Sequence, residues 1–270
     1  MNTMQPDDSG SADSARRDVP IATRRGVLRS AAAGMLGGAT GLFLASCGGN
    51  NGSAGAAGND QLLGQTATEI AADELAHVRF IRQTITSLGG TPVAKPAINL
   101  NPQSLPNSIN TFLILSRAFE DTGVSAYGGA APLISSKVVL GAAARILATE
   151  AYHAGNIRFQ VVERGIAVSA VDGSDQPPTA ANQFPTDVNG LAVIRTPAQV
   201  LAIVTPFFPN GPNGTTSPAT DLEILNFALN LEYLEAEFYS FATTGAGLGN
   251  ADITGSGTAG ATANGFRVTF

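Results

Sequence analysis

Apolar residues recur every three or four positions over residues 62–88, the spacing that forms one face of an α-helix. This face is apolar at both ends and carries two polar side chains, Glu74 and His77, at its middle. Because such a stripe packs into a core, we expect both polar side chains to point inward. A buried carboxylate or imidazole costs several kcal/mol unless it is paired or coordinated, and a metal ion is the simplest partner for both.

The same arrangement occurs in the helix predicted over residues 136–165, where Glu150 and His153 hold the central positions of the stripe. The chain has only two histidines, and each follows a glutamate by three residues. With nine glutamates in 270 residues, two such coincidences have odds of roughly one in a thousand. Residues three apart share one helix face, so each helix can offer one carboxylate and one imidazole to a common ion.

A third helix is predicted over residues 107–129, with Glu120 as the only carboxylate on its apolar stripe. The small residues Ser116 and Gly123 lie about one turn to either side and would leave room for an ion. The alternative is that Glu120 is an ordinary solvated side chain. Tyr127, two turns further along, fits a core position better than a hydrogen bond to a ligand.

A fourth helix, predicted over residues 219–244, carries three glutamates near its middle. Glu232 falls on the apolar stripe, Glu235 lies at its edge, and Glu237 points well away from it. Glu232 is therefore the fourth carboxylate of the expected site, with Glu235 in reserve. Two Glu-x-x-His helices and one glutamate from each of two other helices make up the ligand set of a dinuclear carboxylate site in a four-helix bundle.

The segments between these helices differ in length and composition. Residues 91–106 contain four prolines and are long enough to cross a bundle from end to end. A break at Ala131-Pro132 makes the second and third helices an antiparallel hairpin. Residues 166–220 are rich in Pro, Gly, Asn and Asp, with one helical turn near residues 196–204, and are expected to wrap over the bundle or to be partly mobile. The predicted fold is all-α, a four-helix bundle with long crossover loops.

The composition supports a real core and excludes some partners. Apolar residues make up 44% of the chain, and the net charge is −6. Nucleic-acid binding is excluded because it would require a basic face to neutralise phosphates. A single cysteine excludes an internal disulfide framework and any Cys-based zinc cluster, which leaves carboxylate and imidazole as the abundant metal ligands.

The first 46 residues resemble a twin-arginine export signal, with Arg24 and Arg25 before a run of small and moderately apolar residues. The run ends in Leu-Ala-Ser-Cys47, which resembles a bacterial lipoprotein box. The alternative, a transmembrane helix, is disfavoured because the run is short and full of Gly and Ala. We expect a protein attached to the membrane by lipid on Cys47, on the periplasmic side of a bacterial cell envelope. The chain then divides into an export signal (1–46), a flexible tether (47–60), a four-helix bundle (61–244) and a Gly-rich tail (245–270).

Four stretches resemble the ferritin-like superfamily, and in detail the bacterial ferritin-like domain proteins related to plant desiccation-related proteins. They are EIAADELAHVRF (69–80), FEDTGVSAYGGAAPL (119–133), EAYHAGNIR (150–158) and LNFALNLEYLEAEFY (225–239). The resemblance implies two iron or manganese ions that act on Fe²⁺, peroxide or O₂. The residues that it implies as metal ligands are Glu74, His77, Glu120, Glu150, His153 and Glu232. Iron and manganese are not distinguished, because both accept oxygen and nitrogen ligands.

One feature departs from the family pattern. The helix similar to residues 219–244 comes first in the family, whereas here it is the last of the four. This order indicates a circular permutation. A metal site depends on geometry rather than chain order, so the expected ligand set is unchanged.

Three functions are compatible with these observations. The leading interpretation is an envelope-anchored dinuclear metal oxidoreductase, with a small oxidant or a metal ion as its substrate. The alternative is a non-catalytic desiccation or stress-protection protein that uses the metal site structurally. A plain helical bundle with Glu and His in internal salt bridges is disfavoured by the doubled motif. The oligomeric state, including a homo-oligomer, is left open.

Overall fold

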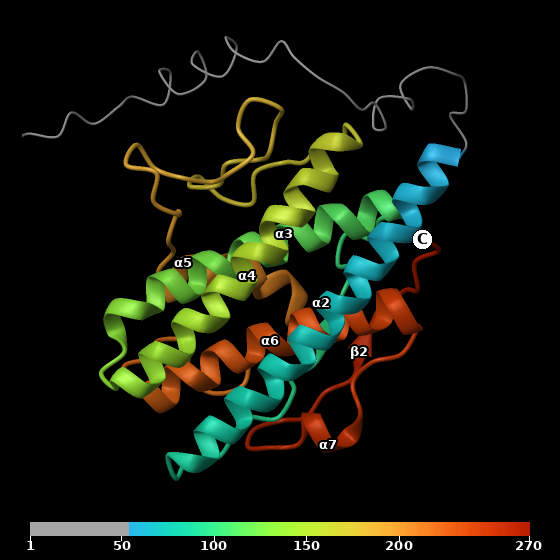
Figure 1. Cartoon of the computed structure of the whole chain (residues 1–270). Helices are drawn as coiled ribbons and strands as arrows, with labels where there is room; N and C mark the ends of the chain where they lie inside the picture. Colours follow the sequence, from blue (N-terminus) through green and yellow to red (C-terminus); the bar gives the residue numbers. More distant parts are fainter. Residues whose placement is uncertain (1–53) are drawn as a thin grey trace, which may run out of the picture. The chain divides into compact units, whose positions relative to one another are not determined.

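Four long helices carry the fold, as expected (Figure 1). They are α2 (Ala54–Ser87), α3 (Ile109–Ala130), α4 (Lys137–Glu163) and α6 (Asp221–Thr244). The structure is a computed structural model that describes residues 54–270, so the expected export signal and Cys47 lie outside the described residues. α2 begins at Ala54, which makes the last part of the expected tether helical. No helix in the described range has the length and apolar character needed to cross a membrane.

Capping side chains set the helix boundaries close to the predicted ones. The hydroxyl of Ser108 accepts a hydrogen bond from the backbone N–H of Thr111 at the start of α3, and Ser136 caps α4 in the same way. Thr220 and Glu223 form a capping box at the start of α6. These side chains satisfy N–H groups that have no partner within the helix.

The helices form two antiparallel pairs (Figure 1). α2 and α6 pack along each other, and Gly90, just beyond the end of α2, lies against Leu222 at the start of α6. α3 and α4 form the predicted hairpin, joined by the short 3₁₀ helix η1 (Ala131–Leu133). The segment between α2 and α3 crosses the bundle and contains strand β1 (Ile98–Asn99). The stripes of the four helices face a common core of buried apolar side chains.

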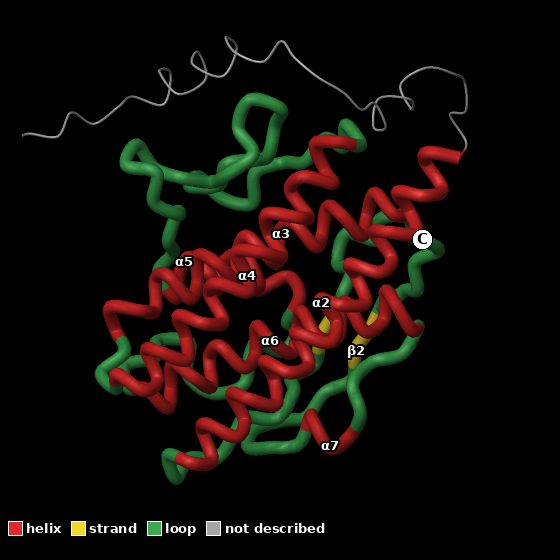
Figure 2. Tube along the Cα trace, in the orientation of Figure 1, coloured by secondary structure: helices red, strands yellow, loops and turns green. Residues whose placement is uncertain are grey.

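An ion pair and a hydrogen bond from two buried arginines hold the long segment between α4 and α6 against the bundle. The segment contains α5 (Pro197–Val204) and the 3₁₀ helix η2 (Thr205–Phe207), and the rest is loop (Figure 2). Arg117 of α3 donates to Asp175 at 2.6 Å, and Arg158 of α4 donates to the backbone carbonyl of Gln183 at 2.6 Å. The segment is therefore an ordered wrap, the first of the two expected alternatives.

The Gly-rich tail is part of the packed fold. It contains α7 (Asn250–Ile253) and strand β2 (Thr262–Ala263), which pairs in parallel with β1. Phe266 and Val268 are buried in the core.

The tail also covers Glu237 of α6. Glu237 leaves the apolar stripe, as predicted, but it is buried and accepts a hydrogen bond from the backbone N–H of Leu248 at 3.2 Å. The sequence pattern of α6 alone gives no sign that the tail buries this carboxylate.

Candidate metal centre

The six residues predicted as metal ligands meet at the centre of the bundle. α2 contributes Glu74 and His77, α3 contributes Glu120, α4 contributes Glu150 and His153, and α6 contributes Glu232. Five of the six are buried, and the side chain of His77 is 12% exposed. The solvated alternative for Glu120 is wrong, because Glu120 has no exposed surface.

The ligand atoms form two overlapping groups of four. One group is Glu74, His77, Glu150 and Glu232, and the other is Glu74, Glu120, Glu150 and His153. Within each group the ligand atoms lie within 4.8 Å of one another. Two glutamates, Glu74 and Glu150, belong to both groups. Each group adds one histidine and one glutamate of its own.

Glu74 lies between the two imidazoles. Its Oε2 is 3.3 Å from Nδ1 of His77, and its Oε1 is 3.0 Å from Nδ1 of His153. Nδ1 of His77 is also 3.2 Å from Oε1 of Glu150 and 3.3 Å from Oε2 of Glu232. Glu232 of α6 and His77 of α2 are thus in direct contact.

Many of the buried ligand atoms lack a hydrogen-bond partner within the described part of the chain. They are Oε1 of Glu74, Oε2 of Glu120, both carboxylate oxygens of Glu150, Nδ1 of His153 and Oε2 of Glu232. Buried polar atoms are normally paired, and an unpaired buried carboxylate is costly. A cation that accepts oxygen and nitrogen ligands would satisfy all of these atoms at once, so the donor set fits a metal.

The crowding of carboxylates shifts the protonation of the whole cluster. Burial raises the pKa of Glu150 well above its usual range, and the charge of Glu74 adds to the rise. Burial also raises the pKa of Glu232 to about 7, although the nearby imidazole of His77 opposes the rise. Burial alone would lower the pKa of His153, but the nearby carboxylates of Glu120 and Glu74 raise it to about 11. The cluster therefore retains protons near neutral pH, and metal ions would replace them.

Comparison with known proteins agrees with this geometry. A model of the ferritin-like domain matches residues 27–163 and 220–267, which is more than half of the chain. The chain belongs to the ferritin-like domain family. The chain matches no curated protein and no solved structure.

Two tyrosines of this ferritin-like domain hold the outer oxygens of the glutamates that belong to one group each. Tyr127 of α3 donates a hydrogen bond to Oε1 of Glu232, and Tyr239 of α6 donates one to Oε1 of Glu120. Both tyrosines are buried. The expectation that Tyr127 is only a core residue is therefore wrong, because its ring is in the core and its hydroxyl contacts a predicted ligand.

Asp73 makes a similar contact with an imidazole. Its Oδ2 lies 3.2 Å from Nε2 of His153, while Nδ1 of that ring faces the carboxylates. A carboxylate at the far nitrogen of a metal-binding histidine fixes the orientation of its ring. The sequence prediction does not include Asp73, although its position four residues before His77 places both on the same side of α2.

Glu235, the reserve carboxylate, is buried beside the cluster and belongs to neither group of four. A methyl group on Gly123 would come 2.7 Å from Oε2 of Glu150 and 3.3 Å from Oε1 of Glu235, so both carboxylates approach this glycine. Burial raises the pKa of Glu235 well above its usual range, and the charge of Glu150 raises it further. Glu235 therefore holds its proton more strongly than an exposed glutamate would, next to a shared ligand.

Two clefts between α2 and α4 reach the imidazoles from the surface, and we term them the polar clefts because each has charged and hydroxyl side chains beside its imidazole. His153 lines one of them together with Glu69 and Asp73, and His77 lines the other together with Arg145. Thr149 borders both clefts. Dissolved ions and small polar molecules can approach the cluster from this side.

Proposed function

We propose that the ferritin-like domain holds two iron or manganese ions and carries out redox chemistry on O₂, peroxide or Fe²⁺. The observation that supports this most strongly is the position of Glu74, which offers one oxygen to each of the two groups of ligands. A single ion would need only one group. Two overlapping groups with two shared carboxylates suit a pair of ions.

Different residues would have different roles at such a site. Glu74 and Glu150, which belong to both groups, would help to hold both ions and to neutralise their charge, while Tyr127 and Tyr239 fix the carboxylates of Glu232 and Glu120. Bound iron or manganese would supply Lewis acidity and a change of oxidation state. The clefts at His77 and His153 give polar reactants a route from solvent.

The alternative is a non-catalytic protein of desiccation or stress protection in which the metal stabilises the bundle. The burial of five of the six ligands favours it, because a closed site leaves little surface for a reactant. Turnover of O₂ or peroxide by the metal-loaded protein would exclude this alternative.

Metal analysis of the purified protein tests the site. We expect close to two ions per chain. Glu74→Gln and His153→Ala should each lose at least one ion, because each substitution removes a ligand atom from the site. Glu163→Gln is the matched control, since Glu163 lies on the exposed end of α4. If Glu74→Gln and His153→Ala bind as much metal as this control, the proposed site is wrong. Oxygen and peroxide consumption by the loaded protein then tests the reaction.

We further propose that the protein is anchored to a bacterial cell envelope by lipid on Cys47, on the periplasmic side. The twin arginines and the Leu-Ala-Ser-Cys motif support this anchor. Mass spectrometry of the protein from its own cells should find a lipid-modified Cys47 at the amino terminus. An unmodified chain that keeps the leader would contradict the anchor and leave the metal site untouched.

We also propose that the chain is a circular permutant of the desiccation-related ferritin-like proteins. Phe270, at the carboxyl end, packs against Gly64 in the first third of α2. In the family order α6 precedes α2, so the two ends that the permutation would separate should lie close together. Their closeness supports the proposal.

A further inference from the structure

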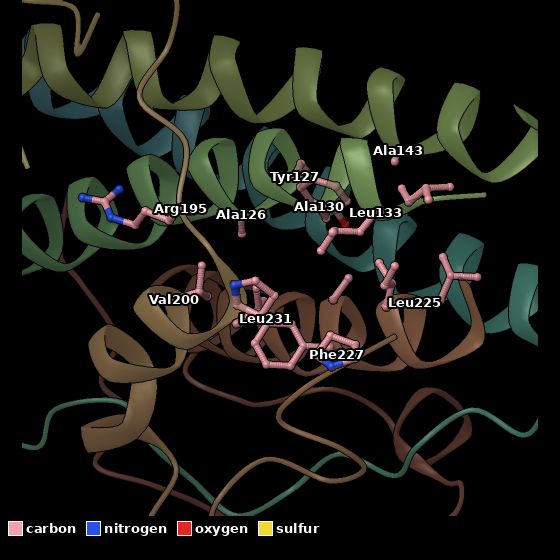
Figure 3. Close-up of a pocket in the computed structure, with 15 residues that line it drawn as sticks. Ala126, Tyr127, Ala130, Leu133, Ala143, Arg195, Val200, Leu225, Phe227 and Leu231 are labelled. Atoms are coloured by element: carbon pink, nitrogen blue, oxygen red, sulfur yellow. The ribbon is translucent and has the colours of Figure 1, made fainter. Parts of the chain in front are cut away.

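An apolar pocket lies on a part of the bundle that the polar clefts do not reach. Ala126 and Tyr127 of α3, Val200 of α5, and Phe227 and Leu231 of α6 project into it (Figure 3). α2, which contributes to both polar clefts, has no residue in its lining. The pocket is therefore a separate approach to the interior.

The pocket offers no free polar group to a guest. Of its lining residues only Tyr127 and Arg195 carry a polar side chain. The Arg195 guanidinium donates to Asp172 at 2.8 Å and to the hydroxyl of Ser125 at 2.8 Å, and the Tyr127 hydroxyl is bonded to Glu232. An apolar pocket of this kind disfavours polar guests and accepts apolar ones.

Tyr127 separates this pocket from the carboxylate cluster. Its ring lines the pocket, and its hydroxyl contacts Glu232 on the other side. Leu231, which also lines the pocket, is the residue next to Glu232 on α6. A guest in the pocket is thus one side chain away from the predicted ligands.

The pocket distinguishes between the three reactants of the proposed function. A metal ion would lose its hydration in an apolar cavity, and peroxide would lose its hydrogen bonds, so both are excluded by their desolvation cost. Dioxygen has neither charge nor hydrogen-bond donors. The cavity of about 40 Å³ is small beside the roughly 150 Å³ cavity that holds benzene, so it suits a guest of very few atoms.

We propose that the apolar pocket binds dioxygen and delivers it to the carboxylate cluster past Tyr127, while ions and peroxide use the polar clefts. This inference rests on the redox function proposed above. It assigns the apolar pocket to one reactant and the clefts to the others. The variant that tests it is Ala228→Leu, which fills the pocket with a larger apolar side chain. The matched control is Ala148→Leu, at an exposed position on α4.

The first experiment uses the metal-free protein under dissolved oxygen gas. Paramagnetic O₂ should broaden and shift the methyl NMR signals of Ala126, Ala228 and Leu231 more than those of other buried methyl groups. Ala148→Leu should keep this effect at Ala126 and Leu231, and Ala228→Leu should lose it. Because no metal is present, this result does not depend on the proposed function. An even effect over all core methyl groups would overturn the proposal.

The second experiment compares the two oxidants in the metal-loaded protein. We expect Ala228→Leu to raise the KM for O₂ by roughly tenfold with little change in kcat, and to leave the KM for peroxide unchanged. Ala148→Leu should alter neither. An equal rise in both KM values would overturn the proposal, because it would mean damage to the shared site. Failure of the parent protein to bind metal would overturn the proposed function. The NMR experiment would still test oxygen binding in the pocket, because it uses the metal-free protein.

Discussion

Tyr239 of α6 donates a hydrogen bond to Oε1 of Glu120 on α3, the carboxylate oxygen that does not face His153. The reverse pairing joins Tyr127 of α3 to Glu232 of α6. On each helix the tyrosine follows the glutamate by seven residues, or about two turns. The two helices therefore exchange identical contacts across the core, and each carboxylate keeps one oxygen for the cluster.

Tyr239→Phe should weaken metal binding and the fold together. The variant leaves Oε1 of Glu120 buried without a donor, which costs about 1–3 kcal/mol in the free energy of unfolding. Loss of a residue that orients a metal ligand typically lowers metal affinity by about 10–100-fold. Metal titration and urea unfolding measure the two effects. Tyr152→Phe is the control, since Tyr152 is 78% exposed on α4. Equal metal affinity in the two variants would show that the hydroxyl does not position Glu120.

Gly123→Ala should reduce metal binding with little loss of stability. The added methyl group would lie 2.7 Å from Oε2 of Glu150, so this shared carboxylate must move. The end of a glutamate side chain moves at small cost, and alanine favours the helix by about 1 kcal/mol over glycine. Gly155→Ala on α4 meets no atom within 4 Å and is the matched control. The number of metal ions bound per chain measures the effect of each substitution. A Gly123→Ala protein with the full metal content would mean that the position of Glu150 is not critical.

The stability of the metal-free protein should fall as the pH rises from 5 to 8. Glu232 has a pKa of about 7 in the folded state against an ordinary value of 4.5, because burial disfavours its charge. The folded protein thus holds the proton more tightly than the unfolded chain. The stabilisation is complete below the unfolded value and is lost as the pH passes through the folded value. His153 acts in the same direction, because Glu120 and Glu74 raise its pKa to about 11 although burial opposes the rise.

Metal should reverse this trend. Protons compete with metal for the ligands, so metal affinity grows with pH and stabilises the loaded protein more at pH 8 than at pH 5. Thermal unfolding at several pH values, with and without Mn²⁺, measures how the Tm of the loaded and of the metal-free protein changes with pH. Carboxyl groups with a lowered pKa, such as Glu223, titrate below pH 5 and do not affect the trend between pH 5 and 8. A Tm of the metal-free protein that rises between pH 5 and 8 would contradict the argument.

The helices and the six predicted ligands could be found from the sequence because each is encoded locally. The apolar stripes around Glu74, Glu120 and Glu150 fix which side of each helix faces the core, and a polar residue on a stripe is visible without a structure. The choice of Glu232 over Glu235 followed from the same rule. It holds in the structure, where only Glu232 belongs to a group of possible ligands.

The remaining features depend on contacts between distant segments. The burial of Glu237 requires the tail to fold over α6, and Gly-rich composition does not indicate such packing. The role of Tyr127 depends on a carboxylate on another helix, so the periodicity of α3 identifies its ring as core and gives no information about its hydroxyl. The repeated seven-residue spacing between glutamate and tyrosine on α3 and α6 is the one sequence signal that could have identified both tyrosines.

Under the proposed permutation, a chain in which α6 precedes α2 should preserve the fold and the metal site. Phe270 lies against Gly64, so a short linker can join the carboxyl end to residue 59, in the second turn of α2. The chain can be opened between Thr216 and Ser217, two exposed residues in the segment before α6. Loops with exposed backbone tolerate new termini, and the contacts within the bundle do not depend on how the helices are connected.

The rearranged protein should bind as much metal per chain as residues 59–270 in their present order and unfold at a similar temperature. Opening the chain inside α5 instead, between Val200 and Leu201, is the control, because Val200 is buried there and its helix would be broken. That variant should unfold more easily. If the variant opened at Thr216 also loses metal or fails to fold, the present order is needed to assemble the site. The contact between Glu232 and His77 would then depend on α6 coming last in the chain. Such a dependence would contradict the proposal that the permutation leaves the bundle unchanged.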